Sequence, residues 1–533
     1  MKLKKHFLLV ALFSVLALTV VFTSCNISLE RTGGSNTADS SGDTNAPNDN
    51  NTSGNTSTPD NTNTSDDNNS SGDNGNSGGG STQTPQTREV FGFFGPEWFI
   101  NSVMKFRAGE TYKDPDDTTA PAVSDPTVTN SMRAADRVAI NVMSFISDVP
   151  GMIEEYQMSS GADWALNTTI IATTDGMYQP ALNDMLADGE VDIFAAEAAF
   201  VLDYSKGDIS KYAAPYEDFI EDFDNKLKDA DIAEYTSTIG SNDEGKIIAL
   251  GYQSNGCCFI YRRSIAKKVF GTDNPERIGE IIGAKTGSWD KFFEAAAKCK
   301  EKGYAMISGL DDIYLMIDGF SNGWLDENNK LCIDEKQEAY LDIAKRIIEN
   351  GWSNNTQTWI EAWDADMRGK NGTYGDWAVC LPPTGAFWGG TWIFATQEAI
   401  ANPAKKAIVA DIIEYLTLDT TDKGWLYKWA TGTRWNLNIG YSDSITKDSV
   451  ASAVVMQNVD GTSDFCGGQD IHKVYAQADK MVDGTKMTAY DNTINSFWRG
   501  LVREYAEGHK TKEEVIKELK DKVKAEFEEI VID

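Results

Sequence analysis

The folded part of the chain opens on an alternation of short apolar runs and amphipathic stretches. Three apolar runs predict buried strands, and the two stretches between them carry apolar residues at helical spacing. The five segments are a strand at 137–145, a helix from Pro150, a strand at 168–173, a helix from Asp175 to Gly189, and a strand at 191–196. This order predicts parallel βαβ units, so we expect an α/β lobe with a parallel-type sheet flanked by helices.

The rest of the chain predicts a second lobe, because residues 89–533 exceed the roughly 250–300 residues that one core holds. The extended run 247–261 is interrupted by Gly251 and Gly256, as in a strand that leaves one core and enters another. Pro382-Pro383 and Gly389-Gly390 mark a second crossing of this kind. Helices are expected at 264–270, 289–302, 337–350, 397–401, 404–416 and 511–530, and a further strand at 374–380.

The first 88 residues have the composition of a targeting segment and a tether. Lysines precede an apolar run at 7–22 that is shorter than the about 20 residues of a membrane-spanning helix, which predicts a signal peptide over 1–24. The run ends at Cys25, so we expect either lipidation of Cys25 with anchoring to a bacterial membrane, or cleavage and secretion. Ser, Thr, Asn, Asp and Gly dominate the following residues, which predicts a disordered tether over 25–88. Either outcome exports the protein to the cell envelope, facing the periplasm or the exterior.

Charge and residue counts exclude several classes of function. The net charge is −33, from 81 acidic and 48 basic residues, which argues against a nucleic-acid partner, because phosphate binding needs a cationic face. Only three histidines occur, His6, His472 and His509, so a His-rich metal site is excluded and a Ser-His-Asp triad is disfavoured. The seven cysteines show no metal-binding spacing. We therefore expect no metal, no cofactor and mostly free, buried thiols.

Several short segments, taken in order, carry a family resemblance. They are Val191-Asp-Ile-Phe-Ala-Ala-Glu197, Ile248-Ala-Leu-Gly-Tyr-Gln253 with 259–263, 303–309, Trp388-Gly-Gly-Thr-Trp392, 401–406, 465–469 and 505–508. Their order behind an export signal resembles the extracellular solute-binding lipoproteins (family 1, carbohydrate type) of ABC importers, the group that includes maltose-binding protein. The resemblance implies two hinge-linked α/β lobes, a mono- or oligosaccharide ligand in the cleft between them, delivery to ABC permease subunits, and no catalysis.

The crossings and the resemblance together give the expected domain boundaries. We expect a first lobe of 131–250 and 386–440 and a second lobe of 251–385 and 441–533. In the family, an apolar strand followed by Gly-Pro-Trp normally precedes the strand expected here at 374–380, but the close match stands at Val90-Phe-Gly-Phe-Phe-Gly-Pro-Glu-Trp98. We therefore predict a permuted chain, with 90–107 in the second lobe beside 374–379 and a connector up to residue 130. An ordinary N-terminal extension is the alternative.

The candidate ligand-binding residues follow from the chemistry of sugars, which present flat C–H faces ringed by hydroxyl groups. Such ligands need aromatic rings and planar polar side chains, placed where parallel strands end. The aromatic candidates are Trp98, Tyr178, Trp388 and Trp392, and the hydrogen-bonding candidates are Ser147, Asp148, Glu197 and Gln253. For each of them the competing interpretation is core packing, a helix cap or a hinge hydrogen bond.

Two other classes of function stay open at this point. A surface glycan-processing enzyme would need two carboxylates about 5–10 Å apart across a cleft, and no local motif indicates such a pair. A glycan-binding adhesin would bind a polymer and no small solute. Turnover of an oligosaccharide would favour the enzyme, and tight binding to a polymer alone would favour the adhesin.

Overall fold

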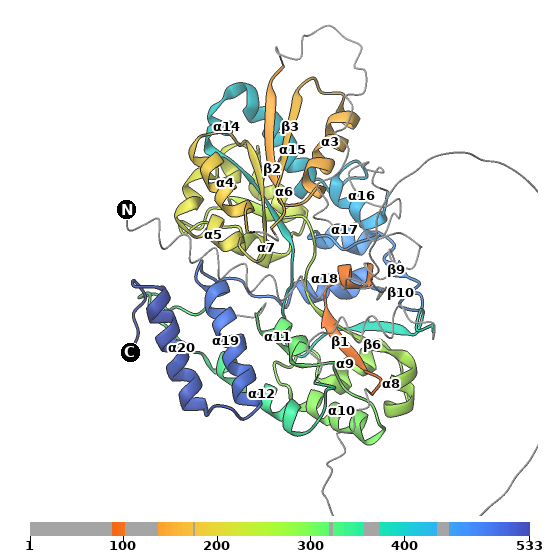
Figure 1. The fold of residues 1–533 in the computed structure, drawn as a ribbon. Coiled ribbons are helices and arrows are strands. Elements are labelled where there is room, and N and C mark those ends of the chain that lie inside the picture. The colour runs from red at the N-terminus through yellow and green to blue at the C-terminus, as the bar shows by residue number, and fades with distance from the viewer. Residues whose placement is uncertain (1–87, 102–136, 174–175, 319–322, 356–371, 434–446) are drawn as a thin grey trace, which may run out of the picture. The chain divides into compact units, whose positions relative to one another are not determined.

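A computed structural model of the 533-residue chain describes residues 88–101, 137–173, 176–318, 323–355, 372–433 and 447–533 (Figure 1). These residues belong to one compact unit. The signal peptide, Cys25, the tether, residues 102–107 of the predicted second-lobe segment, and the connector up to residue 130 lie outside the described residues. In the described part of the chain, no helix has the length and the apolar character that crossing a membrane requires.

The first sheet has five strands in the order β3-β2-β4-β8-β5. Their bounds are β2 Ala139–Ser144, β3 Ala165–Ile170, β4 Ile193–Glu197, β5 Ala249–Gly251 and β8 Thr391–Ala395. Strands β3, β2 and β4 pair in parallel, as the βαβ pattern predicts, whereas β8 pairs antiparallel with both β4 and β5. The sheet is therefore mixed, because β8 returns from the second crossing and enters the sheet from the opposite end.

Successive side chains along the strands of the first sheet point to opposite faces, and both faces are covered. Ile193 and Ala195 of β4 pack in the core beneath α3 (Asp148–Ser160) and α15 (Pro403–Thr417). Phe194 and Ala196, one residue out of phase, pack in a separate core with α4 (Tyr178–Ala187). Because successive residues of a strand face opposite sides, a continuous apolar run is what a sheet covered on both faces requires.

The second sheet contains β1 (Gly92–Gly95), β6 (Cys258–Arg262) and β7 (Trp377–Cys380), in the order β1-β6-β7. The segment 92–95 thus joins the sheet for which it was predicted, but its expected neighbour is wrong. β1 pairs antiparallel with β6, which separates it from β7. On its other side, β1 meets residues 305–306 through a parallel bridge at Val90 and backbone hydrogen bonds from Phe91 and Gly92. This central position explains why the strand is apolar throughout. The antiparallel pairing of β1 with β6 and of β6 with β7 corrects the expectation of parallel-type pairing in this sheet.

Helices complete both halves of the described chain (Figure 1). After α3 and α4, the further helices before β6 are α5 Val201–Ser205, η2 Asp208–Tyr212, η3 Tyr216–Asp218, α6 Phe223–Asp229 and α7 Glu234–Ile239. Those following β6 are α8 Arg263–Phe270, α9 Pro275–Ile282, α10 Asp290–Glu301, α11 Leu310–Asp318 and α12 Glu335–Glu349. The remainder are α14 Gln397–Ala401, α16 Trp425–Thr431, α17 Ala453–Asn458, α18 His472–Asp479, α19 Asp491–Ala506 and α20 Lys512–Glu526, and a short hairpin pairs β9 Thr462–Ser463 with β10 Gln469–Asp470.

Candidate ligand-binding site at the crossing segments

Three segments of the chain pass between the two sheets and pair with one another. The first crossing joins β5 to β6, the second joins β7 to β8, and the third precedes α17. Cys257 N donates to Ala386 O at 2.7 Å and Trp388 N donates to Asn255 O at 3.0 Å, which joins the first two crossings. An antiparallel bridge between Gln253 and Val450 joins the first to the third. The crossings therefore form a continuous ribbon rather than separate flexible links.

Gly389 and Gly390 end the second crossing in backbone conformations that other residues rarely adopt. Their φ angles are +76° and +111°. A Cβ on Gly390 would come within 2.6 Å of the Asn255 side-chain nitrogen, and one on Gly389 within 3.3 Å of the Trp98 indole nitrogen. Gly390 O accepts from Ala198 N at 3.0 Å, just beyond the end of β4. Glycine is needed here because the backbone turns sharply and passes close to neighbouring side chains.

We expect Gly390→Ala to destabilise the protein, by about 1–3 kcal/mol, through the strained φ and the contact with Asn255. The free energy of unfolding in urea measures this loss. Gly287→Ala is the matched control, because Gly287 has a φ of +71° and no atom within 4 Å of an added Cβ. Its loss of stability therefore measures the backbone strain alone, without the contact that Ala would make with Asn255. Equal losses in the two variants would contradict the close approach at Gly390.

Trp388 is the centre of a connected group of aromatic and charged side chains, which we call the Trp388 array: Trp98, Asp311, Tyr314, Trp388, Arg499 and Arg503. The Trp98 indole N–H donates to Trp388 O at 3.4 Å. The Trp388 ring meets the Tyr314 ring edge to face, with centroids 6.2 Å apart. Trp388 is half-buried and packs against both main apolar cores, so it lies where the two cores meet.

The charged half of the Trp388 array lies on two helices. The Arg499 guanidinium of α19 lies over the Tyr314 ring of α11, 4.1 Å from the centroid. Arg499 and Arg503 each donate from Nη2 to the same oxygen of Asp311, at 2.9 and 3.0 Å. Positions four apart share one face of a helix, which brings both arginines to one carboxylate. Flat rings next to charged planar donors are the side chains that a saccharide requires.

A buried polar contact holds the helical turn 97–101 that carries Trp98. Glu97 and His472, both almost inaccessible, are joined at 3.1 Å between Oε1 and Nε2. Asn101 Nδ2 donates to Asp448 Oδ1 at 2.8 Å. Burial lowers the pKa of His472, but the charge and hydrogen bond of Glu97, helped by Asp448 and Asp470, raise it more, so the net pKa lies above its usual value. These contacts fix Trp98 relative to the third crossing and α18.

Solved structures share the overall fold of this chain. An extracellular solute-binding protein of family 1 superposes with a TM-score of 0.57 at 15% identity, and covers 73% of this chain and 99% of its own. The chain has the fold of the extracellular solute-binding proteins. The sugar-binding protein MalE from Xanthomonas citri matches this solute-binding fold with a TM-score of 0.54, 13% identity, and coverage of 73% and 97%.

A third match to the solute-binding fold is the galacto-N-biose/lacto-N-biose I-binding protein of the ABC transporter from Bifidobacterium longum, in complex with lacto-N-biose. Its TM-score is 0.52 at 13% identity, with coverage of 74% of this chain and 99% of the other. No protein-family model matches the chain. No curated protein sequence matches it either. The likeness therefore lies in the backbone, which is consistent with a resemblance spread over short segments.

Six of the eight predicted site residues are partly exposed in this solute-binding fold. Trp98 and Trp388 meet in the Trp388 array. Glu197 ends β4 opposite Thr391, directly beside Gly390, and Ser147 and Asp148 begin α3 after the neighbouring parallel strand β2. Gln253 lies on the first crossing, in the bridge to the third.

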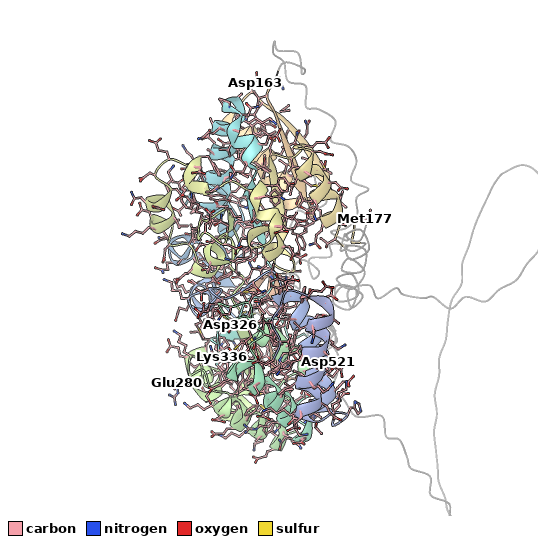
Figure 2. The ribbon with its side chains drawn as sticks, turned by 90° about the vertical axis from the view of Figure 1, so that its left-hand side faces the viewer. Asp163, Met177, Glu280, Asp326, Lys336 and Asp521 are labelled. Atoms are coloured by element: carbon pink, nitrogen blue, oxygen red, sulfur yellow. The ribbon has the colours of Figure 1, made fainter. Side chains whose placement is uncertain are left out.

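The other two predicted residues, Tyr178 and Trp392, are buried. Tyr178 is 1% exposed, and its hydroxyl donates to Ala195 O at 2.6 Å. Met177, one residue earlier, is 56% exposed and projects from the surface (Figure 2). Trp392 is inaccessible, and its indole N–H donates to Thr236 O at 2.8 Å. Both rings pack in the core beneath α4, so we leave them out of the proposed binding surface.

Four members of the Trp388 array were missed from the sequence: Asp311, Tyr314, Arg499 and Arg503. Two arginines four apart beside Phe497-Trp498 were the available signal. Their shared partner Asp311 is distant in the chain and could not be inferred. Among the described residues, no group of three or more His, Cys, Asp or Glu is placed to hold a metal ion. The six cysteines that the structure describes are free thiols, all buried except Cys332, as expected.

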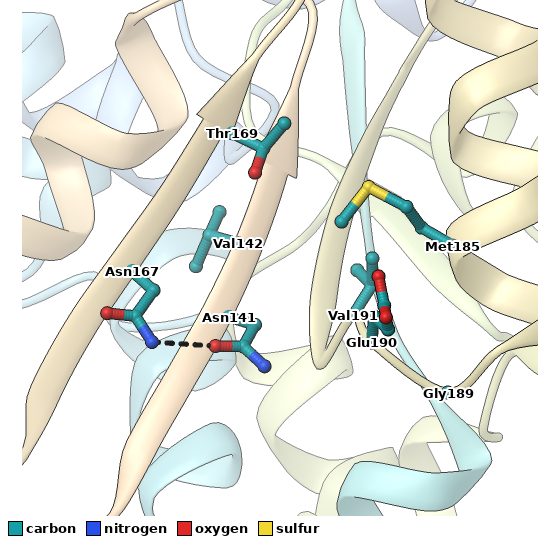
Figure 3. A pocket seen from close by; sticks show the side chains of 8 residues that line it. All are labelled: Asn141, Val142, Asn167, Thr169, Met185, Gly189, Glu190 and Val191. Atoms are coloured by element: carbon teal, nitrogen blue, oxygen red, sulfur yellow. Dashed lines mark hydrogen bonds between the residues drawn. The ribbon is translucent and has the colours of Figure 1, made fainter. Parts of the chain in front are cut away.

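A separate cavity of about 470 Å³ lies beside strands β2 and β3 of the first sheet (Figure 3). It is lined by β2, β3, Met185 of α4, and residues 189–191 between α4 and β4. Asn167 Nδ2 donates to Asn141 Oδ1 at 2.9 Å across its floor. The two asparagines lie in the middle of β2 and β3, and residues 189–191 precede β4. No residue of the Trp388 array lines this cavity, so the two sites are distinct.

Proposed function

We propose that this protein is the substrate-binding component of an ABC importer, which captures a carbohydrate between its two lobes and delivers it unchanged to a membrane permease. The single observation that carries the proposal is the Trp388 array at the paired crossings of a solute-binding fold. Saccharide recognition combines stacking on aromatic faces with hydrogen bonds from planar polar groups, and the array supplies both. The partly exposed ends of β2 and β4 supply further polar side chains on the facing lobe.

The proposed mechanism is closure of the lobes around the ligand. A hydrogen bond already joins α19 to the segment after β4, because Asn492 Nδ2 donates to Ala199 O. A ligand that touches Trp388 and Glu197 together binds the closed form better than the open form, and so shifts the equilibrium toward closure. The permease would recognise this closed form. Buried polar groups left unpaired by a wrong sugar would give selectivity.

We further propose that the protein acts at the cell envelope. Export by the signal peptide and lipidation at Cys25 would anchor it to a bacterial membrane, and residues 25–88 would tether the rest of the chain to that anchor. Mass spectrometry of the membrane fraction tests this directly. A diacylglyceryl-modified Cys25 as the mature N-terminus supports the anchor, and a soluble protein cleaved elsewhere refutes it.

A thermal-shift screen against mono- and oligosaccharides tests the binding function. A sugar present at 100 times its dissociation constant adds about 2.7 kcal/mol of stability, which is readily measured. Recovery of the sugar unaltered after prolonged incubation separates binding from hydrolysis. A screen in which no saccharide raises the melting temperature, or in which the saccharide is cleaved, would contradict the proposal.

We expect Trp388→Ala to weaken binding of a saccharide found in this screen about tenfold or more, which corresponds to about 1.4 kcal/mol of lost contact. Isothermal titration calorimetry measures the change. Trp289→Ala is the control, because Trp289 is also half-buried but packs on Phe94 and Phe292, outside the array. An affinity unchanged by Trp388→Ala, or lowered equally by both variants, would remove Trp388 from the site.

A further inference from the structure

The charge of the Trp388 array is opposite to that of the chain. The whole sequence carries −33, yet two guanidinium groups meet one carboxylate at this point, since Arg499 and Arg503 share Asp311 Oδ1. The neighbouring Asp312 does not balance them. It is inaccessible and accepts from Ser308 N at 2.9 Å, and burial raises its pKa to about 8, so it is mostly protonated at pH 7. The array therefore has a local excess of one positive charge.

Both guanidinium groups keep N–H donors for which the described residues supply no hydrogen-bond partner. Each arginine has five N–H donors in a planar fork. In the described parts of the chain, the hydrogen bonds of Arg499 and Arg503 are the single bonds to Asp311. Their side chains are 25% and 32% exposed, so both arginines are partly accessible to solvent. The Tyr314 ring fixes the plane of Arg499.

An accessible arginine fork held by an aromatic ring is suited to a carboxylate, which it binds with two parallel hydrogen bonds. A neutral sugar would leave the excess charge without a counter-ion when the lobes close, and burying an unpaired charge is costly. A carboxylated sugar supplies both the missing negative charge and the C–H face that packs on Trp388.

We propose that the site selects an anionic saccharide, one that contains a uronic or other carboxylated sugar, and that Arg499 and Arg503 bind its carboxylate. This inference rests on the proposed binding function and makes it more specific. The sugar ring packs on Trp388 and Trp98. The carboxylate accepts hydrogen bonds from the guanidinium N–H groups of Arg499 and Arg503 that do not bond to Asp311. Asp311 holds the two guanidinium groups in place and lowers their mutual repulsion.

The test uses oligosaccharides of galacturonate, glucuronate and mannuronate, and N-acetylneuraminate, each paired with its neutral methyl ester. We expect at least one acid to bind by calorimetry at least tenfold more tightly than its ester, with an affinity that falls as salt is raised. If neutral sugars bind and every acid binds no better than its ester, this inference is overturned while the proposed function stands. If no saccharide of either kind binds, both are overturned.

Two variants then locate the carboxylate. Arg499→Gln and Arg503→Gln keep planar donors but remove the charge, and each is expected to lower the ratio of acid to ester affinity at least tenfold. A purely structural role would weaken both ligands alike and leave the ratio unchanged, which would contradict the proposal. Arg346→Gln is the matched control, because Arg346 also lies over an aromatic ring, that of Phe293, and pairs with an aspartate, Asp290, outside the array.

Discussion

We expect the protein to be more stable at pH 5 than at pH 8, by on the order of 3 kcal/mol or more. Burial raises the pKa of several carboxyl groups in the native state, and it does so most strongly for three of them. Burial raises the pKa of Asp312 to about 8 and those of Asp203 and Asp479 to about 7, although hydrogen bonds to each carboxyl partly oppose the effect. The midpoint of urea unfolding, followed by tryptophan fluorescence across this pH range, measures the change.

The direction follows from proton binding in the two states. In the unfolded chain these carboxyls lose their protons near pH 4, whereas the native protein holds them up to pH 7–8, so stability falls as pH rises between these values. His472 acts in the same direction, because its raised pKa gives stability below about pH 6.5 that is lost as pH rises through its native pKa. Carboxyls whose pKa is lowered, such as Asp326 and Glu518, act below about pH 5, outside this window.

Asp312→Asn is the variant that tests this account. Asparagine can still accept the backbone N–H groups of Ser308 and Gly309, but it has no proton to lose, so the pH dependence of stability is expected to shrink. Asp326→Asn, at an exposed position (Figure 2), should leave the pH dependence between 5 and 8 unchanged. A stability that rises from pH 5 to pH 8, or an equal response of both variants, would show that buried carboxyls do not control it.

We expect Lys428→Met to destabilise the protein by about 3–5 kcal/mol, because it removes the cation from a buried ion pair. Lys428 Nζ of α16 lies 2.7 Å from Glu155 Oε1 of α3, whose side chain is inaccessible. The same ammonium donates to the Tyr415 hydroxyl of α15 at 3.2 Å. One lysine thus joins three helices of the first lobe, and without it the Glu155 charge stays buried. The free energy of unfolding in urea measures the loss.

Two further variants separate charge from packing at this pair. Glu155→Gln combined with Lys428→Met removes both charges, and should recover most of the stability that Lys428→Met loses. Lys517→Met breaks an exposed pair with Asp521 and should leave the free energy of unfolding nearly unchanged. If the double variant is no more stable than Lys428→Met, the loss comes from packing, and the account of a buried Glu155 charge that has lost the Lys428 cation is wrong.

The positions of several helices could be predicted from local patterns in the sequence. The helix expected at 404–416 is α15, Pro403–Thr417, which is capped by the side chain of Asn402 and has proline at its first position. The helix expected at 511–530 is α20, Lys512–Glu526, which begins with a capping box between Thr511 and Glu514. Such signals are local, so a single sequence displays them. The place of β1 between β6 and residues 305–306 depends on distant partners, which explains why its neighbour was wrong.

The candidate site was predictable only in part, for a related reason. Periodicity identified α4, and Gly389-Gly390 marked the crossing before β8, but neither signal gives the direction of individual side chains. Tyr178 and Trp392 were therefore expected at the ligand, and both are buried. Trp388 was identified because glycines at a crossing mark a close approach of backbone and neighbours. Asp311 and Arg499 come from helices far apart in the sequence and meet only in the folded chain.

The most direct test of the account is a crystal structure of the protein with a saccharide from the thermal-shift screen. The account predicts an intact sugar between the two lobes, with a ring stacked on Trp388 and polar contacts from the ends of β2 and β4. A sugar bound at the Asn141–Asn167 cavity, a cleaved product, or a sugar that leaves Trp388 untouched would contradict it.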